Sequence, residues 1–238
     1  MSYGFKIITE GDYACFTRPE MKVERVSYEV PTPGALEGLL KSIYWKPAIR
    51  YVIDEIVVFR PIQFVNIRRN EVKEKIRYAR IRERMVGGEA DPSVFVKESV
   101  NQRNAMILKN VKYGIGFHFE MTGMRSQNPD EGEDKHYSIL ARRLERGQVF
   151  RQPCFGCREF SVKQIIQVKA FSLGEIDESL KGDMDLGCML YHMKFADSGQ
   201  LRPGADARFS DMAAPVYYHP HLVDGVIDVG KYRRTMIC

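Results

Sequence analysis

The chain has 238 residues, of which 44% are hydrophobic, so it can bury a sizeable core in one large domain or two small ones. Its formal net charge of +5 is a modest positive excess that favours a polyanionic partner. No apolar stretch reaches the length of a membrane span, no secretory signal opens the chain, and the five cysteines are scattered, so we expect a reduced cytoplasmic protein with no membrane partner.

The first part of the chain predicts a strand, a helix and a second strand. Residues 4–16 begin with apolar residues and predict the first strand. Thr32 and Pro33 supply a capping hydroxyl and a proline at the first helical position. The helix carries one apolar stripe, made by Leu36, Leu39, Leu40 and Ile43. Residues 51–65 are β-branched and aromatic and predict a strand interrupted at Pro61.

The end of the first helix is set by a proline. Because Pro47 disfavours helical backbone before it, we expect the helix to end just after Trp45. Tyr44 and Lys46 then lie at a helix C-terminus.

The largest shift in composition lies in residues 66–84. This stretch holds eight cations and three acids, a local excess of five positive charges. Its cations are Arg68, Arg69, Lys73, Lys75, Arg77, Arg80, Arg82 and Arg84. Arginine outnumbers lysine here, and arginine both grips phosphate in a bidentate way and stacks on bases. A nucleic-acid contact and a solvated charged helix with internal ion pairs are both open interpretations.

The second part of the chain predicts a strand, a helix and a strand. Residues 111–121 alternate between apolar and polar positions and predict a strand with one buried face. His118 lies on the polar face of that strand. A polar loop over residues 122–134 precedes the helix, and residues 160–171 predict the last strand of this part.

The helix between those two strands starts with a lysine beside a histidine. Asp134 is the expected N-cap, because its carboxylate can accept from the amides of the first turn. The helix continues through Ile139, Leu140 and Leu144, and Gly147 is its expected stop. Lys135 and His136 therefore lie at the positive end of a helix, which collects anions. These groups suit a site for a phosphodiester, and a solvated helix start is the alternative.

Strand, helix, strand, occurring twice, indicates an α+β protein with a ferredoxin-like, RRM-like βαββαβ core. We predict this core over residues 1–171, with a basic insertion at about 66–104. Short strands and turns from Ser172 onward predict a small β-rich C-terminal domain over residues 172–238.

The sequence predicts no metal site and no cofactor. Cys154 and Cys157 have the spacing of half a zinc site, but no second pair follows, so we interpret them as buried free thiols. His219 and His221 flank Pro220 at a spacing that suits a metal ligand pair, but we expect a solvated turn there.

Six short motifs, in order along the chain, together resemble one known family. They are SIYWKP at 42–47, RPI at 60–62, NIRRNEV at 66–72, KHY at 135–137, GCREF at 156–160 and DGVIDV at 224–229. The resemblance runs from about Gly11 to the C-terminus. The family is the fifth group of CRISPR-associated proteins, in the d variant of type I-C systems, within the RAMP superfamily.

The resemblance implies an RRM-like core and an activity. Members cut CRISPR precursor RNA within each repeat, without a metal, and stay on the 5′ handle of the crRNA inside the surveillance complex. The implied partners are therefore CRISPR repeat RNA, the large subunit and the backbone subunit of the complex. Double-stranded DNA is a further possible partner. The family's catalytic residues correspond to Tyr44, Lys135 and His136. The expected RNA-binding residues are Lys46, Arg68, Arg69, Lys73 and Arg77.

Metal-free RNA cleavage uses the ribose 2′-hydroxyl as nucleophile and leaves a 2′,3′-cyclic phosphate and a 5′-hydroxyl. We expect His136 to be the base for the 2′-hydroxyl and Lys135 to stabilise the phosphorane. Tyr44 would position the ribose or protonate the leaving oxygen. The main alternative is a structural subunit that binds RNA without chemistry, as fifth-group proteins of other type I systems do, and a DNA-binding module is a third interpretation.

Overall fold

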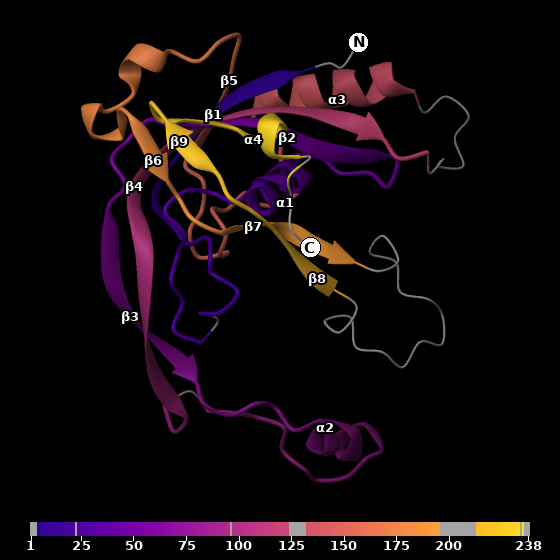
Figure 1. Ribbon diagram of the computed structural model, residues 1–238. Helices are drawn as coiled ribbons and strands as arrows, with labels where there is room; N and C mark the ends of the chain where they lie inside the picture. The colour runs from indigo at the N-terminus through magenta and orange to yellow at the C-terminus, as the bar shows by residue number, and fades with distance from the viewer. Residues whose placement is uncertain are drawn as a thin grey trace.

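The computed structural model describes residues 4–21, 23–95, 97–123, 132–195, 213–233 and 235 (Figure 1). The strands are β1 (Phe5–Ala14), β2 (Ile49–Val58), β3 (Phe64–Val72), β4 (Val100–Met121), β5 (Gln164–Val168), β6 (Asp183–Asp185), β7 (Met189–Phe195), β8 (Ala213–Tyr218), β9 (His221–Val223) and β10 (Val226–Asp228). The α-helices are α1 (Pro33–Ile43), α2 (Tyr78–Met85), α3 (Glu133–Arg146) and α4 (Val229–Tyr232).

The centre of the structure is one antiparallel sheet in the order β5-β1-β4-β2-β10-β9-β6, with β3 paired to β4 off this path. Four of its strands, β5-β1-β4-β2, have the order of a ferredoxin-like core. Helix α1 contacts β2, α3 contacts β5, and the two helices contact each other, so both cover one face of the sheet. The α+β, RRM-like prediction is therefore confirmed.

The local signals of α1 act as expected at its start and differ slightly at its end. The Thr32 hydroxyl accepts from the Ala35 N–H at 3.3 Å, and Pro33 opens the helix. The apolar stripe is buried in the main core. The helix ends at Ile43, two residues earlier than predicted, because Tyr44 adopts an extended conformation (φ −150°, ψ 131°).

Helix α3 begins at Glu133, two residues earlier than predicted. Its N-cap is Gly132, which has no capping side chain, so the prediction of Asp134 as N-cap is wrong. Asp134 lies in the first turn instead, where its negative charge interacts favourably with the positive end of the helix dipole. Gly147 ends the helix in the left-handed region (φ 63°), as predicted.

Two further predictions concern strands. The alternating segment 111–121 is confirmed as part of β4, and its inward side chains up to Phe119 are buried. The strand predicted over residues 160–171 is shorter, because only β5 pairs with β1 and the preceding residues form a loop closed by a Cys154–Ser161 bridge. Residues 124–131 of the predicted polar loop lie outside the described residues.

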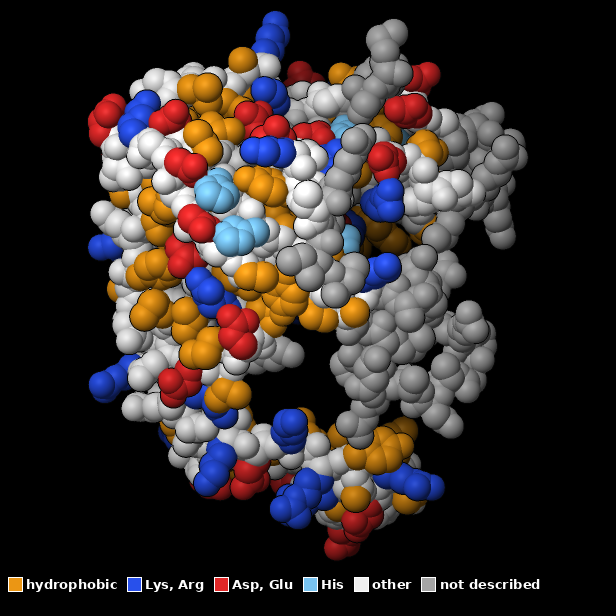
Figure 2. Space-filling model, viewed as in Figure 1, with side chains coloured by type: hydrophobic (Ala, Val, Ile, Leu, Met, Phe, Trp, Pro, Cys, Tyr) orange, Lys and Arg blue, Asp and Glu red, His pale blue; other side chains and the backbone are white. Residues whose placement is uncertain are grey.

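The basic stretch is a projecting arm rather than one charged helix. Strand β3 pairs with the first half of β4 from Phe64↔Leu108 to Val72↔Val100, and α2 lies at the tip of this hairpin (Figure 1). One face of the hairpin packs on a small apolar cluster, which consists of Cys15, Ala105, Ile107 and Phe160 with Val65, Ile67 and Cys157 beside them. We call β3, α2, their connections and the paired half of β4 the basic arm. Figure 2 shows Lys and Arg side chains along it.

The C-terminal part is rich in short strands, as predicted. Strand β10 pairs with β2, and β9 and β6 continue the same sheet. Buried residues of this part, such as Leu222 and Ile227, belong to the same core cluster as β1 and α1. The division of the chain at residue 171 stays a prediction. None of the described helices is long and apolar enough to cross a membrane.

Candidate active site

The centre of the candidate site is a hydrogen bond between the two helices. The Tyr44 hydroxyl and His136 Nδ1 are 2.8 Å apart, although the residues are 92 positions apart in the sequence. Tyr44 is the C-cap of α1, and His136 lies in the first turn of α3. The two side chains are only 3% and 1% exposed. The structure thus brings together two of the three predicted catalytic residues.

The third predicted catalytic residue lies at the surface. Lys135 precedes His136 on α3 and is exposed, because consecutive helical residues point in directions about 100° apart. Its ammonium therefore faces solvent at the same helix end at which the imidazole of His136 faces the core.

The position of Tyr44 is defined by groups on two other elements. The Arg143 guanidinium lies 5.2 Å from the centre of the Tyr44 ring and donates to the Ile43 carbonyl at 2.6 Å. The Tyr51 hydroxyl donates to the Tyr44 carbonyl at 2.7 Å. Burial raises the pKa of Tyr51, so its hydroxyl stays protonated and remains a donor. The ring and the carbonyl of Tyr44 are both fixed in this way.

A pocket of about 540 Å³ opens beside Tyr44. Its lining combines cationic and aromatic side chains: Lys41, Tyr44, Trp45, Lys46, Pro47, Arg143, Phe150 and Arg151. Trp45 is 53% exposed and Phe150 is 81% exposed, which is unusual for rings of this size. Cations beside exposed rings are typical of surfaces that bind single-stranded nucleic acid. We call this feature the Trp45 pocket.

The sequence analysis found only part of this pocket. It singled out Lys46 and Tyr44, but it missed Arg143, Phe150 and Arg151. The available signal was an aromatic residue beside an arginine, shortly after the predicted helix stop at Gly147. The backbone N–H groups of Phe150 and Arg151 both donate to the Ser42 carbonyl, at 2.9 and 3.1 Å, and this contact brings them to the end of α1.

The predicted RNA-binding residues of the basic arm have different environments. Arg68, Lys73 and Arg77 are exposed. Arg69 is on the opposite face of β3 and forms ion pairs with Glu71 and Glu159. Lys46 is not part of the arm and lines the Trp45 pocket.

His118 has a partner that the sequence did not indicate. Its Nδ1 lies 2.7 Å from Asp54 Oδ2, across the β2–β4 pairing. Arg233 also pairs with Asp54. His118 is therefore part of an ion-pair group at the sheet.

The cysteines of the 154–157 motif do not pair with each other. Cys157 instead lies by the buried Cys15, and a hydrogen bond with the Cys15 thiol lowers the pKa of Cys157. The described cysteines are free, as predicted, although Cys154 and Cys157 are half-buried and Cys188 is exposed. Cys238 lies outside the described residues.

Among the described residues, one group of side chains could hold a metal ion, and it lies elsewhere. It consists of Asp185, His219 and His221. The sequence predicted a solvated turn at the two histidines and did not identify Asp185, whose approach depends on the register between β6 and β9.

Comparison with known proteins agrees with this fold. A family model of Cas5d, described as a CRISPR-associated protein (Cas_Cas5), matches residues 5–230. A solved structure described as the crystal structure of a CRISPR-associated protein superposes with a TM-score of 0.61 and 24% sequence identity, and the match covers 95% of this chain and 91% of that one. The class of protein is therefore an RRM-like CRISPR-associated protein.

Two curated relatives are similar over most of their length, and both are named CRISPR pre-crRNA endoribonuclease Cas5d. The relative from Mannheimia succiniciproducens is 41% identical over 225 residues, which cover 93% of this chain and 92% of the relative. The relative from Thermus thermophilus is 34% identical over 232 residues, which cover 94% and 90%. The chain belongs to the Cas5d family of CRISPR-associated proteins.

Proposed function

We propose that this chain is a metal-independent endoribonuclease that cuts CRISPR precursor RNA within the repeat and stays bound to the 5′ handle. The observation that carries the proposal is the buried Tyr44–His136 hydrogen bond beside the Trp45 pocket. The proposal is also supported by the two curated relatives, which are both named pre-crRNA endoribonucleases.

The burial of the pair favours a division of roles that differs from the sequence-based one. Tyr44 lines the pocket, whereas His136 lies behind it and is 1% exposed. We therefore assign the contact with the ribose to the Tyr44 hydroxyl. His136 acts through that hydroxyl, as its proton acceptor, when Nε2 carries the proton and Nδ1 accepts.

The chemical step then follows from these roles. The ribose 2′-hydroxyl gives its proton to the Tyr44 oxygen, while the Tyr44 proton moves to His136 Nδ1. The 2′-oxygen attacks phosphorus, the bond from phosphorus to the 5′-oxygen breaks, and that oxygen leaves with a proton from water. The hydroxide that this forms takes up the proton gained by His136, returned through the Tyr44 hydroxyl, so the site is restored. The exposed Lys135 ammonium stabilises the extra charge on the phosphorane. The products are a 2′,3′-cyclic phosphate and a 5′-hydroxyl.

The Trp45 pocket and the basic arm would both bind the RNA that is cut. Trp45 and Phe150 offer faces for unpaired bases, and Lys46 and Arg151 offer charge to the backbone. Arg68, Lys73 and Arg77 are the exposed cations of the arm that we assign to phosphate contacts. Arg69 contributes by holding the arm through its ion pairs.

We further propose that the chain works in a type I-C surveillance complex, with the large and backbone subunits and the bound crRNA as partners. Binding of double-stranded DNA is a secondary proposal, because the exposed cations of the arm do not distinguish the two nucleic acids.

Single-turnover cleavage of a repeat-containing RNA tests the main proposal. We expect cleavage to persist in EDTA and to stop when the one nucleotide before the cut is 2′-deoxy. A loss of cleavage in EDTA that magnesium restores would refute metal-independent chemistry. An RNA that shifts in a gel and is never shortened would instead support the non-catalytic structural subunit.

A further inference from the structure

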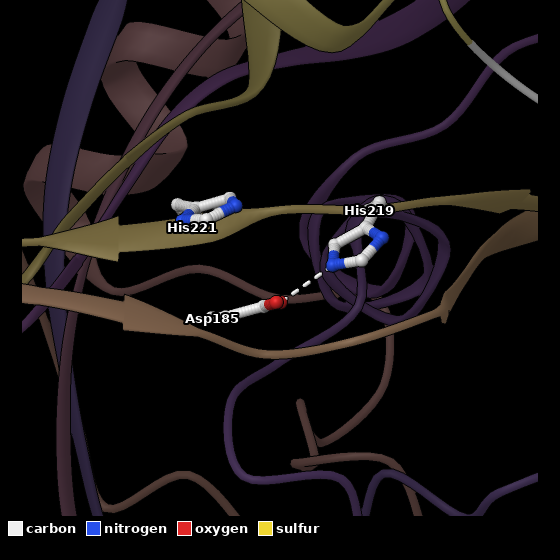
Figure 3. A group of neighbouring side chains, drawn as sticks. All are labelled: Asp185, His219 and His221. Atoms are coloured by element: carbon white, nitrogen blue, oxygen red, sulfur yellow. Dashed lines mark hydrogen bonds and ion pairs between the residues drawn. The ribbon is translucent and has the colours of Figure 1, made fainter.

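Two histidines and an aspartate converge at the edge of the sheet opposite β5. His219 follows β8, Pro220 is buried, and His221 opens β9, while Asp185 closes β6 (Figure 3). One ligand atom from each of Asp185, His219 and His221 lies within 4.8 Å of the others. The imidazole rings are stacked with centroids 5.8 Å apart, and His219 Nε2 is 2.5 Å from Asp185 Oδ1.

The backbone around these side chains is fixed by pairing between strands. Asp185 is the register partner of His221 in the β6–β9 pair. The Leu186 N–H donates to the Pro220 carbonyl at 3.1 Å, which ties the segment after β6 to the turn between the histidines. The Gly187 N–H donates to Asp185 Oδ1 at 2.8 Å and orients that carboxylate. The donor atoms therefore converge without a bound ion.

A fourth side chain, that of Asp183, contacts His221 in the way that carboxylates contact metal-binding histidines. Asp183 Oδ1 lies 2.8 Å from His221 Nδ1. A carboxylate that accepts from Nδ1–H fixes the tautomer of the ring and directs Nε2 toward a metal. Such carboxylate–histidine pairs are the usual second layer around protein-bound zinc.

The donor set indicates the class of ion. Imidazole nitrogen suits zinc, cobalt, nickel and copper, whereas calcium and magnesium prefer oxygen ligands alone. Three protein ligands leave a fourth position for water in a tetrahedral site. His219 and Asp185 are exposed, so water can reach that position. Figure 2 shows histidine side chains beside acidic ones on this face, a setting that favours a cation.

We propose that Asp185, His219 and His221 bind one divalent transition-metal ion of the zinc class, with Asp183 as the outer partner of His221. The ion replaces the direct hydrogen bond between His219 and Asp185 with bonds from both residues to the metal. It thereby joins the residue that ends β6 to the residues that follow β8 and begin β9. The role is structural, and it is independent of the proposed RNA cleavage.

The test uses the full chain without a histidine tag, stripped of metal with EDTA and then desalted. Zn²⁺ alone is the probe, titrated by calorimetry, and unfolding temperature is measured with and without it. We expect one equivalent to bind and to raise the unfolding temperature. His219→Gln and His221→Gln should abolish both effects, and Asp183→Asn should weaken binding by about tenfold to hundredfold, the usual effect of removing the carboxylate behind a histidine ligand.

His192→Gln is the matched control, because this histidine lies on β7 beside Glu37 rather than at the site, and its Zn²⁺ affinity should equal that of the unsubstituted chain. Replacing Zn²⁺ with Co²⁺ should give d–d absorption without a thiolate charge-transfer band. A charge-transfer band, with unchanged binding in both histidine variants, would assign the metal to Cys154 and Cys157 and overturn the proposal. The absence of any binding to the stripped chain would overturn it as well.

Discussion

Replacing Tyr44 with phenylalanine removes one oxygen from the candidate site and leaves the ring. The ring would keep its position under the Arg143 guanidinium, 5.2 Å from the ring centre, so the Trp45 pocket should stay intact. The oxygen that is removed is the one 2.8 Å from His136 Nδ1. We expect single-turnover cleavage to slow by about a hundredfold or more, the scale for removing a general acid–base group, with RNA affinity nearly unchanged.

The same change should also lower stability, because it removes the Tyr44 partner of a buried polar group. His136 is 1% exposed, and depriving such a group of a hydrogen bond costs about 1–3 kcal/mol. For a chain of this size each kcal/mol lowers the unfolding temperature by about 2–4 °C. A loss of activity must therefore be separated from a loss of folded protein, by assaying well below the unfolding temperature.

Tyr28→Phe is the control for that separation. Tyr28 is equally buried, at 1% exposed, and its hydroxyl accepts from the Leu190 N–H at 3.2 Å. This variant should lose comparable stability and keep the cleavage rate of the unsubstituted chain. If Tyr44→Phe cleaves RNA at the unsubstituted rate, the Tyr44 hydroxyl is only structural and the proposed proton path is wrong. If both variants slow equally, the effect is one of stability.

Four other substitutions test the basic arm, the Trp45 pocket and the backbone conformation at two glycines. Arg68→Glu should weaken RNA binding and reduce the log–log salt slope by about 0.7 to 0.9 for each phosphate that the arm no longer neutralises, measured by titration at several salt concentrations. Phe150→Ala should weaken binding by about fivefold to 150-fold, since stacking of one base contributes about 1–3 kcal/mol, while the unfolding temperature stays unchanged. Gly156→Ala should strongly lower the unfolding temperature, because φ is +79° and the new Cβ would lie 1.9 Å from the Cys15 carbonyl oxygen. Gly147→Ala meets no atom within 4 Å and should cost only the strain of its positive φ, about 1–2 kcal/mol.

Charge and exposure controls accompany the two binding experiments. Lys181→Glu makes the same type of charge reversal at an exposed site outside the arm, and Leu173→Ala removes an apolar side chain that is 50% exposed outside the pocket. Both should leave RNA binding as it is. Equal losses in Lys181→Glu and Arg68→Glu would mean that net charge, rather than the arm, governs affinity. An unchanged affinity in Phe150→Ala would remove the Trp45 pocket from the RNA path.

The core could be predicted from sequence because its signals are local and periodic. The stripe on α1 and the alternation in β4 each select one buried face, and the Thr32 cap and the Gly147 stop select the helix ends. The start of α3 was misassigned because Gly132 caps the helix through its backbone alone, so the side-chain rule selected Asp134. The ends of short elements depend on such contacts more than on composition.

The candidate site was predictable only in part, because its residues are far apart in the sequence and are brought together by the packing of separate elements. The resemblance supplied Tyr44 and His136, but nothing in their spacing indicates that both would be buried or that one would lie behind the other. The exposed ring of Phe150 carries no periodic signal at all. Arg68 and Arg69 are neighbours in a basic stretch, but side chains alternate along a strand. Arg69 therefore forms ion pairs, whereas Arg68 is exposed to solvent.

The meeting of α1 and α3 supports the role proposed for Tyr44, because it fixes the position of a tyrosine at the end of a helix. His136 and Arg143 are seven positions apart on α3, about two turns, so both face α1. His136 binds the Tyr44 hydroxyl, and Arg143 binds the Ile43 carbonyl and covers the Tyr44 ring. Tyr51 on β2 holds the Tyr44 carbonyl. Because these contacts come from two packed elements, the hydroxyl is already held in one orientation without RNA, which is what the proposed proton transfer from the ribose requires.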